Sequence, residues 1–211
     1  IEVGTINQFR YTEKLAKPVI FVVNQLDQEK ADYDNVVAQL KDRYGNKVIP
    51  IQYPVACGPS FNQVVDVLKM KLYRWKPEGG VPDVLEIPEE EMETAMELHQ
   101  ALVEASAEND ETLMEKFFEG EKFTKEEILK GLCIGIFDGS IYPVYAVSGL
   151  TCAGVDQLLY GLAWSAPGAF GYAGEKCTYE NGEEGILPCD ENGPLAAVCF
   201  KTIADPFVGK M

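Results

Sequence analysis

The sequence is poor in basic residues and has no long apolar run. Its 211 residues contain 18 lysines and arginines against 34 aspartates and glutamates, a formal net charge of -16. Proteins that bind the nucleic-acid backbone use clustered Lys and Arg to displace counterions, so we expect no direct nucleic-acid binding. No run of about 18 uncharged apolar residues exists to span a bilayer, and the N-terminus lacks the pattern of a secretory signal. We therefore expect a cytoplasmic protein without a membrane partner.

Metal-binding side chains are also scarce. The six cysteines form no Cys-x-x-Cys pair and have no histidine at ligand spacing, so no metal site is expected. Cytosolic thiols are normally reduced, although Cys177 and Cys189 flank a Gly-rich loop and could pair in an oxidised sample. The single histidine, His99, lies on the apolar stripe of an expected helix. It is therefore predicted to be a packed or interface side chain and not a catalytic base.

Apolar strands alternate with amphipathic helices at both ends of the first 167 residues, the pattern of a doubly wound α/β sheet. The run at residues 19–23 is continuously apolar and β-branched, as in a strand buried on both faces. With 46% hydrophobic residues, the chain can bury one substantial core. The expected elements are a helix from Thr5, its N-cap, to about Ala16, strand 19–23, helix 31–44 with Gly45 as its left-handed cap, strand 47–55, strand 141–147 and helix 155–164.

Residues 51–140 have a different character. An alternating strand at 68–75 and the turn CGPSFN predict a hairpin with the strand before it. Between Glu86 and Glu127 lie 15 acidic and 3 basic residues, a net charge of -12 out of -16 for the whole chain. We interpret the segment as an acidic, mostly helical insertion, although such a charge run is also typical of a solvated helical face. The expected helices are 89–108, with an apolar stripe of Met92, Ala95, Met96, Leu98, Leu102 and Val103, then 111–118, then one from a Thr124–Glu127 capping box to before Gly139.

The C-terminal part of the sequence predicts exposed structure followed by an incomplete domain. Residues 168–193 are rich in Gly, Glu and Asn, as linkers and exposed hairpins are. The segment LAAVCFKT then predicts a new strand for which the remaining residues supply no evident partner. The chain also begins at Ile1 without an initiator methionine. From these two features we expect a piece of a larger protein.

Polar side chains follow two of the expected parallel strands. The run FVVNQLD ends in Asn24 and Asp27, and IYPVYAVSGL ends in Ser148, Gly149 and Leu150. Ligands of open α/β sheets bind beyond the carboxyl ends of the strands. A carboxylate there can accept both the ring and the exocyclic N–H of guanine, for which adenine has no equivalent, and a backbone N–H of the second loop could reach the guanine carbonyl. The alternatives are an Asx-capped strand-end turn and a plain β-to-α turn.

With these motifs the chain resembles bacterial elongation factor G, the translational GTPase that drives translocation on the ribosome. The resemblance covers essentially the whole chain and rests on VGTINQFRYTEKLAKPVIFVVNQLD, VIPIQYPV, the acidic insertion, AVSGL and, most specifically, PLAAVCFKTIADPFVGKM, which is similar to the start of the family's second domain. It implies a partial P-loop GTPase sheet. The implied domains are the C-terminal part of the GTP-binding domain (1–50 and 141–167), the G′ insertion (51–140), a linker with a hairpin (168–193) and the first strands of domain II (194–211).

The resemblance also implies a set of guanine-binding residues. The family motifs Asn-Lys-x-Asp and Ser-Ala-x correspond here to Asn24, Gln25 and Asp27, and to Ser148, Gly149 and Leu150. Gln25 replaces the lysine whose stem lies over the base and whose amine braces the phosphate loop. Gly149 replaces an alanine, which matters little because the backbone N–H binds the base.

The family binds GTP or GDP with magnesium and meets the ribosomal stalk protein through the helical face of G′. This chain has no G-x-x-x-x-G-K-[ST] phosphate loop, no switch segments and no water-positioning residue, so neither a catalytic residue nor a bound cofactor is expected in it. Two alternatives stay open. One is a non-enzymatic ribosome-binding factor that keeps the fold, for which Gln25 is the hint; the other is a ribosomal-protection protein, against which the insertion counts.

Overall fold

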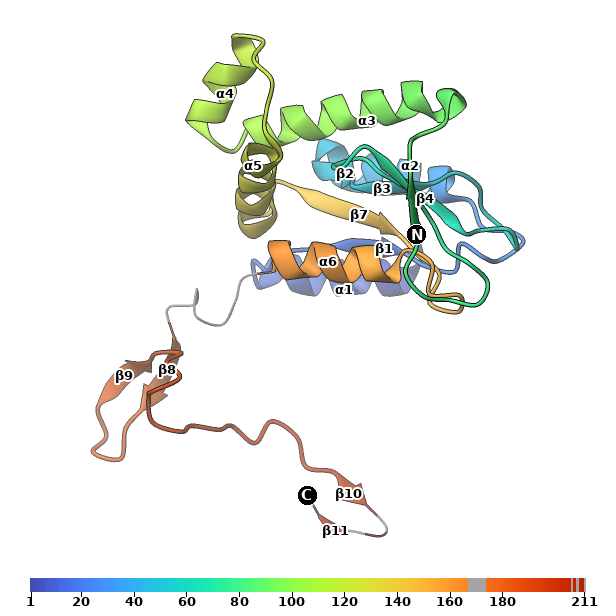
Figure 1. Ribbon diagram of the computed structural model, residues 1–211. Helices are drawn as coiled ribbons and strands as arrows, with labels where there is room; N and C mark the ends of the chain where they lie inside the picture. The colour runs from blue at the N-terminus through green and yellow to red at the C-terminus, as the bar shows by residue number, and fades with distance from the viewer. Residues whose placement is uncertain (167–173, 206, 208, 211) are drawn as a thin grey trace. The chain divides into compact units, whose positions relative to one another are not determined.

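Three parallel strands in the order β1-β7-β2 form the sheet at the centre of the first unit of the chain (Figure 1). The computed structural model describes residues 1–166, 174–205, 207 and 209–210, and the chain divides into the units Ile1–Ala166 and Pro167–Met211. This sheet confirms the predicted α/β class. Its strands are β1 (Phe21–Val23), β2 (Val48–Pro50) and β7 (Tyr142–Ala146).

Helices pack on both faces of the parallel sheet. Phe9 of α1 stacks on Phe21 of β1 and meets Tyr142 of β7 edge-on, with ring centroids 6.2 and 5.5 Å apart. Tyr145 points to the opposite face because side chains alternate along a strand. A Cβ atom on Gly161 of α6 would lie 2.1 Å from the Tyr145 hydroxyl, so the glycine allows this helix to approach β7 closely. The helices are α1 (Val3–Lys14), α2 (Tyr33–Tyr44) and α6 (Val155–Ser165).

The ends of the first two helices differ from the prediction. Thr5 is not the N-cap of α1: the Ile6 N–H already donates to the Glu2 carbonyl at 3.2 Å, so the helix starts earlier and Thr5 lies in its first turn. Asp32 caps α2 by accepting from the Asn35 N–H at 3.0 Å. Gly45 has a φ of 76° but a ψ of -159°, which is not a left-handed helical cap, and the 3-10 turn η1 (Gly45–Lys47) follows.

A second, antiparallel sheet in the order β3-β4-β5-β6 lies within residues 51–140. The prediction of one strand over 47–55 was wrong because the run divides at Ile51 between the two sheets. The Ile51 N–H donates to the Val144 carbonyl of β7, and the Ile51 carbonyl accepts from Val67, both at 3.0 Å. The turn CGPSFN joins β3 to β4, whereas the sequence predicted that it leads to the strand at 68–75. Strands β4 and β6 were not predicted. The strands are β3 (Gln52–Pro54), β4 (Gln63–Asp66), β5 (Lys71–Arg74) and β6 (Asp83–Leu85).

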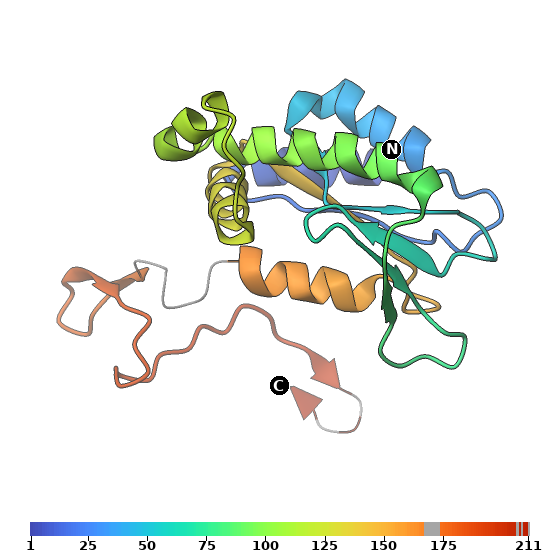
Figure 2. The same cartoon turned by 45° about the horizontal axis from the view of Figure 1, so that its top comes forward.

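Three helices complete the insertion, and α5 stands between the ends of α3 and α6 (Figures 1 and 2). The Thr124–Glu127 capping box is present. The apolar stripe of α3 was predicted too wide: Met92 and Met96 are 38% and 60% exposed. His99 is packed as predicted, with Nδ1 2.8 Å from the Val67 carbonyl oxygen. The helices are α3 (Glu89–Ala107), α4 (Glu111–Phe118) and α5 (Lys125–Asp138).

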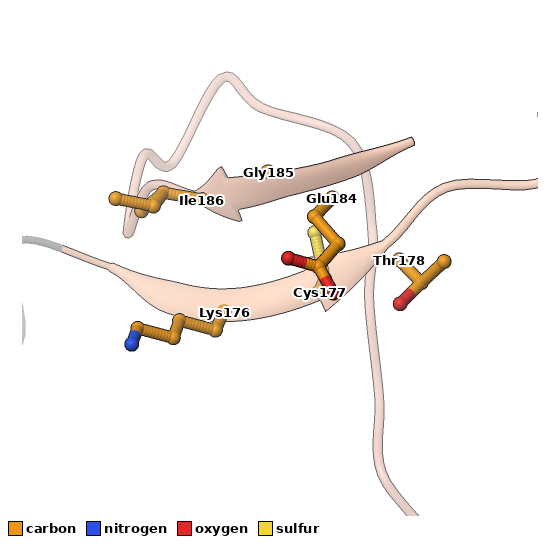
Figure 3. A pocket seen from close by; sticks show the side chains of 6 residues that line it. All are labelled: Lys176, Cys177, Thr178, Glu184, Gly185 and Ile186. Carbon is orange, nitrogen blue, oxygen red and sulfur yellow. The ribbon is translucent and has the colours of Figure 1, made fainter. Parts of the chain in front are cut away.

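The second unit contains the hairpin predicted within 168–193, although residues 168–173 lie outside the described part. Strands β8 (Glu175–Thr178) and β9 (Glu184–Leu187) pair antiparallel, and their side chains line a shallow pocket (Figure 3). Cys177 and Cys189 are both free. The predicted strand at 195–202 was wrong: no strand of the described residues pairs with it, and Leu195 is 100% exposed. Short strands β10 (Ala204–Asp205) and β11 (Gly209–Lys210) follow.

Among the helices of the described residues, none combines the length and the apolar composition that a membrane span requires.

The crossing of α3 and α5 yields a stability prediction. A Cβ atom on Gly131 of α5 would lie 2.1 Å from the Ser106 carbonyl oxygen of α3, so Gly131→Ala must push the two helices apart. Overpacking of this kind typically costs about 1–3 kcal/mol. Urea denaturation should therefore show a lower free energy of unfolding. Gly4→Ala in α1 is the control: its Cβ meets nothing within 4 Å, and alanine there should stabilise by up to about 1 kcal/mol. Equal effects of the two changes would contradict the close crossing.

Candidate functional site

The predicted site residues leave the parallel sheet side by side. Strands β1 and β7 are paired in parallel with Val23 opposite Ala146, so both strands end at the same edge. The pairing continues into the loops, because the Val147 N–H donates to the Val23 carbonyl at 2.9 Å and the Leu26 N–H donates to the Val147 carbonyl at 3.4 Å. The turn after β1 and the loop after β7 are thus held together by backbone contacts.

Two side chains join these loops directly. Asn24 accepts the Gly149 N–H at 2.9 Å through Oδ1, which also accepts the Gln25 N–H at 2.7 Å. Ser148 is fully buried and donates from Oγ to Asp27 Oδ1 at 2.6 Å, while the same Oγ accepts the N–H of Thr151 at 3.2 Å. The structure therefore brings the two predicted motifs together by reciprocal bonds, a serine holding the aspartate and an asparagine holding the glycine.

The Asp27 carboxylate is the charged group of the site. The hydrogen bond from Ser148 is the main cause that holds its pKa below the ordinary value. Its second oxygen, Oδ2, accepts from Gln28 Nε2 at 2.8 Å. Each carboxylate oxygen has a second lone pair, so Asp27 can still accept from a ligand. An ionised, partly exposed carboxylate is suited to a ligand that presents two adjacent N–H donors.

Gln25 turns the backbone at the tip of the first loop. Its φ of 63° lies in the left-handed region, which non-glycine residues seldom occupy. Its backbone N–H points to Asn24 and its carbonyl accepts from the Gln28 N–H at 3.0 Å, while its side chain is exposed and makes no hydrogen bond within the described residues. Gln25 corresponds to the lysine of the family that the sequence resembles. Its side chain is neutral and has no hydrogen-bond partner in the described part of the chain.

The loop after β7 contains two glycines, Gly149 and Gly154, and only Gly154 is required by the backbone geometry. A Cβ atom on Gly154, at φ 80°, would lie 2.3 Å from the Ala146 carbonyl oxygen. A Cβ on Gly149 would lie 3.5 Å from Asn24 Oδ1, an ordinary contact, so alanine would fit there. Leu150 is 80% exposed, and its backbone N–H has no hydrogen-bond partner within the described residues. Sequence reasoning missed Gly154 and Gln28, since neither belongs to a motif.

The described residues contain no group of three or more His, Cys, Asp or Glu side chains that could hold a metal ion. The edge of the sheet presents the Asp27 carboxylate, the side-chain amide of Asn24 and the backbone N–H of Leu150, whereas the N–H of Gly149 is bonded to Asn24. These groups can recognise a flat polar ligand by hydrogen bonds.

Comparison with known proteins shows the fold of this chain. No protein-family model matches the sequence. A crystal structure of a protein from Thermus thermophilus is similar to the whole of this chain, with 29% sequence identity and a TM-score of 0.78. The chain spans 29% of the length of that protein. The structure is accordingly a mixed α/β fold with one parallel sheet and separate antiparallel sheets, and the same fold occurs within a longer protein.

The Ser148–Asp27 bond predicts a titration effect. Ser148→Ala removes the main contact that lowers the Asp27 pKa, so this pKa should rise towards its ordinary value. A lowered folded-state pKa stabilises the fold above the unfolded-state pKa, and that stability is lost as the pH falls through the folded-state pKa. The variant should therefore lose less stability on acidification. NMR titration of the Asp27 carboxyl carbon measures the shift.

Ser140→Ala is the matched control for this titration, because Ser140 Oγ contacts Asn109 Oδ1 at 2.6 Å and no carboxylate. An unchanged Asp27 pKa in Ser148→Ala would show that the serine does not stabilise the charged form.

Proposed function

We propose that residues 1–166 form the base-recognition half of a guanine-nucleotide-binding domain in an elongation factor G-like protein. The observation that carries the proposal is the pair of cross-loop bonds, Ser148 to Asp27 and Gly149 to Asn24. They set a carboxylate and backbone donors on one edge of a parallel sheet, beyond the strand ends where α/β proteins bind ligands. The sequence resemblance to the P-loop GTPases of translation supports the same assignment.

The chemistry of the edge favours guanine over adenine. The Asp27 carboxylate would accept the ring N–H and the exocyclic amine, and hydrogen bonds to an ionised group are stronger than those between neutral groups. The guanine carbonyl would accept from the loop after β7. In that loop the Gly149 N–H is already bonded to Asn24, whereas the Leu150 N–H has no partner within the described residues. Leu150 is thus the more available donor.

GTP hydrolysis is proposed only for a longer protein that contains this chain. Its magnesium and phosphates would be held by a phosphate loop and switch segments, which these 211 residues do not include. A second candidate is a cytoplasmic ribosome-binding factor or ribosomal-protection protein that keeps the fold with little turnover. The observation that favours it is Gln25, whose neutral side chain makes no hydrogen bond in the described part of the chain.

The proposed partner is the ribosome, reached through a stalk protein that contacts the acidic insertion. Helix α3 begins with Glu89, Glu90 and Glu91, and its Met92 and Met96 are exposed. Exposed methionines among glutamates suit a partner with a basic rim and an apolar centre, because methionine adapts to irregular apolar surfaces. RNA is a poor alternative, since the segment from Glu86 to Glu127 has 15 acidic and 3 basic residues.

Asp27→Asn tests the base assignment in the longer protein. The amide keeps one acceptor oxygen and replaces the other by a donor, so guanine should lose a charged contact and bind about 10- to 150-fold more weakly. Xanthine carries a carbonyl where guanine has the amine, so its binding should weaken less or improve. Competition of GDP and XDP against a fluorescent nucleotide measures both. Asp34→Asn, an exposed acid of the first turn of α2, is the control. Unchanged GDP affinity in Asp27→Asn would rule out this guanine site.

Charge reversal on α3 tests the partner. Glu93→Lys and Glu97→Lys change two exposed side chains of the insertion and should each slow association with ribosomes several-fold. The effect should be largest at low salt, because steering between charges is screened over about 8–10 Å at physiological ionic strength. Asp42→Lys makes the same charge change at an exposed position of α2 and is the control. Stopped-flow association rates that respond equally to all three variants would point to the net charge and not to α3.

A further inference from the structure

Two side chains that flank strand β5 of the antiparallel sheet contact helix α6. Lys69 lies between β4 and β5 and donates from Nζ to Gln157 Oε1 at 2.8 Å, and the same Nζ lies 4.1 Å from the ring centroid of Tyr160. Trp75 follows β5 and donates from Nε1 to Asp156 Oδ1 at 3.1 Å. The three partners lie in the first two turns of α6, which begins at Val155. The insertion therefore contacts the N-terminal end of α6 through two hydrogen bonds and one cation–π contact.

Lys69 is itself fixed on the sheet side. Its Nζ lies 3.2 Å from Asp66 Oδ2, and its backbone N–H donates to Asp66 Oδ1 at 2.8 Å. The side chains are 17% and 5% exposed, so solvent screens this pair little. Removal of one member of a buried ion pair leaves the other charge without compensation. The lysine is thus held in one arrangement, with its ammonium group directed at Gln157 and Tyr160.

The start of α6 is tied in turn to the loop that carries the candidate site. The Ser148 N–H donates to the Ala153 carbonyl at 2.9 Å, and the Ala153 N–H donates to Thr151 Oγ1 at 3.4 Å. Gly154 lies so close to β7 that a Cβ atom would meet the Ala146 carbonyl oxygen at 2.3 Å. These contacts connect the end of β7 closely to the start of α6. A shift of the first turn of α6 would therefore move the loop over residues 148–154.

We propose that Lys69 and Trp75 are positioning residues for the loop 148–154: through the first turns of α6 they hold the Ser148 hydroxyl and the backbone N–H groups of Gly149 and Leu150 in place. The inference deepens the proposed function, on which its consequence for nucleotide affinity rests. If the loop reads a base, the acidic insertion becomes a determinant of base affinity. By thermodynamic linkage, a partner that displaces this sheet would then change that affinity, and the nucleotide would change partner affinity by the same factor.

Hydrogen–deuterium exchange of the 211-residue chain tests the positioning role without any nucleotide. Lys69→Met keeps most of the aliphatic stem and removes the ammonium group, so the amides of Gly149 and Thr151 should exchange about tenfold faster. The Val147 amide, bonded to the Val23 carbonyl, reports the sheet itself and should not change. Lys69→Arg should restore slow exchange in the loop. Trp75→Phe removes the hydrogen bond to the exposed Asp156 carboxylate together with part of a ring that is only 6% exposed, and it should also accelerate exchange of the loop amides.

Lys71→Met is the matched control, because Lys71 of β5 pairs with Glu86, which follows β6, and forms no hydrogen bond or ion pair with α6 within the described residues. Equal acceleration at Val147 in both Lys69→Met and Trp75→Phe would mean a general loss of stability and would overturn the proposal, as would unchanged exchange at Gly149 and Thr151.

Nucleotide affinity in the longer protein separates this inference from the proposed function. If Asp27→Asn weakens GDP binding while Lys69→Met leaves loop exchange unchanged, the positioning role fails and the guanine site stands. If Lys69→Met loosens the loop while Asp27→Asn leaves GDP binding unchanged, the positioning role stands and the guanine site fails.

Discussion

The parallel pairing of β1 with β7 is the constraint on which the candidate site depends. With Val23 opposite Ala146, the next residues along each strand emerge together, so Asn24 can hold Gly149 and Ser148 can hold Asp27. A slip of one residue would send every side chain of a strand to the other face of the sheet. The apolar packing of both faces therefore fixes not only the core but also which polar groups meet at the edge.

The sequence identified the parallel strands because a strand buried on both faces is a continuous apolar run. It failed at Ile51, where the apolar run continues but the backbone changes partner from Val144 to Val67. Such a division depends on strands that are distant in the sequence, so the residues around Ile51 contain no local pattern that predicts it. The same is true of Met92 on α3: helical periodicity identifies the apolar stripe, whereas the exposed width of the stripe depends on how far the neighbouring elements reach.

The candidate site was predicted in part for a similar reason. The residue types at the strand ends were visible as motifs, but the sequence does not say which groups are occupied within the chain itself. In the structure, Asn24 Oδ1 engages the Gly149 N–H that was expected to face the ligand, and Gln28 covers one oxygen of Asp27. Internal hydrogen bonds of this kind link loops that are far apart in the sequence, and they emerge only from the three-dimensional arrangement.

The division of one run of chain between two sheets at Ile51 has a mechanical consequence. The Ile51 N–H is bonded to β7 of the parallel sheet and its carbonyl to the antiparallel sheet, so a single peptide segment is shared by both. A hinge requires residues whose backbone torsions can change without loss of hydrogen bonds. At Ile51 both the N–H and the carbonyl are hydrogen-bonded. A displacement of the antiparallel sheet relative to β7 would have to break one of these two hydrogen bonds, so the insertion and the central strand are coupled at Ile51.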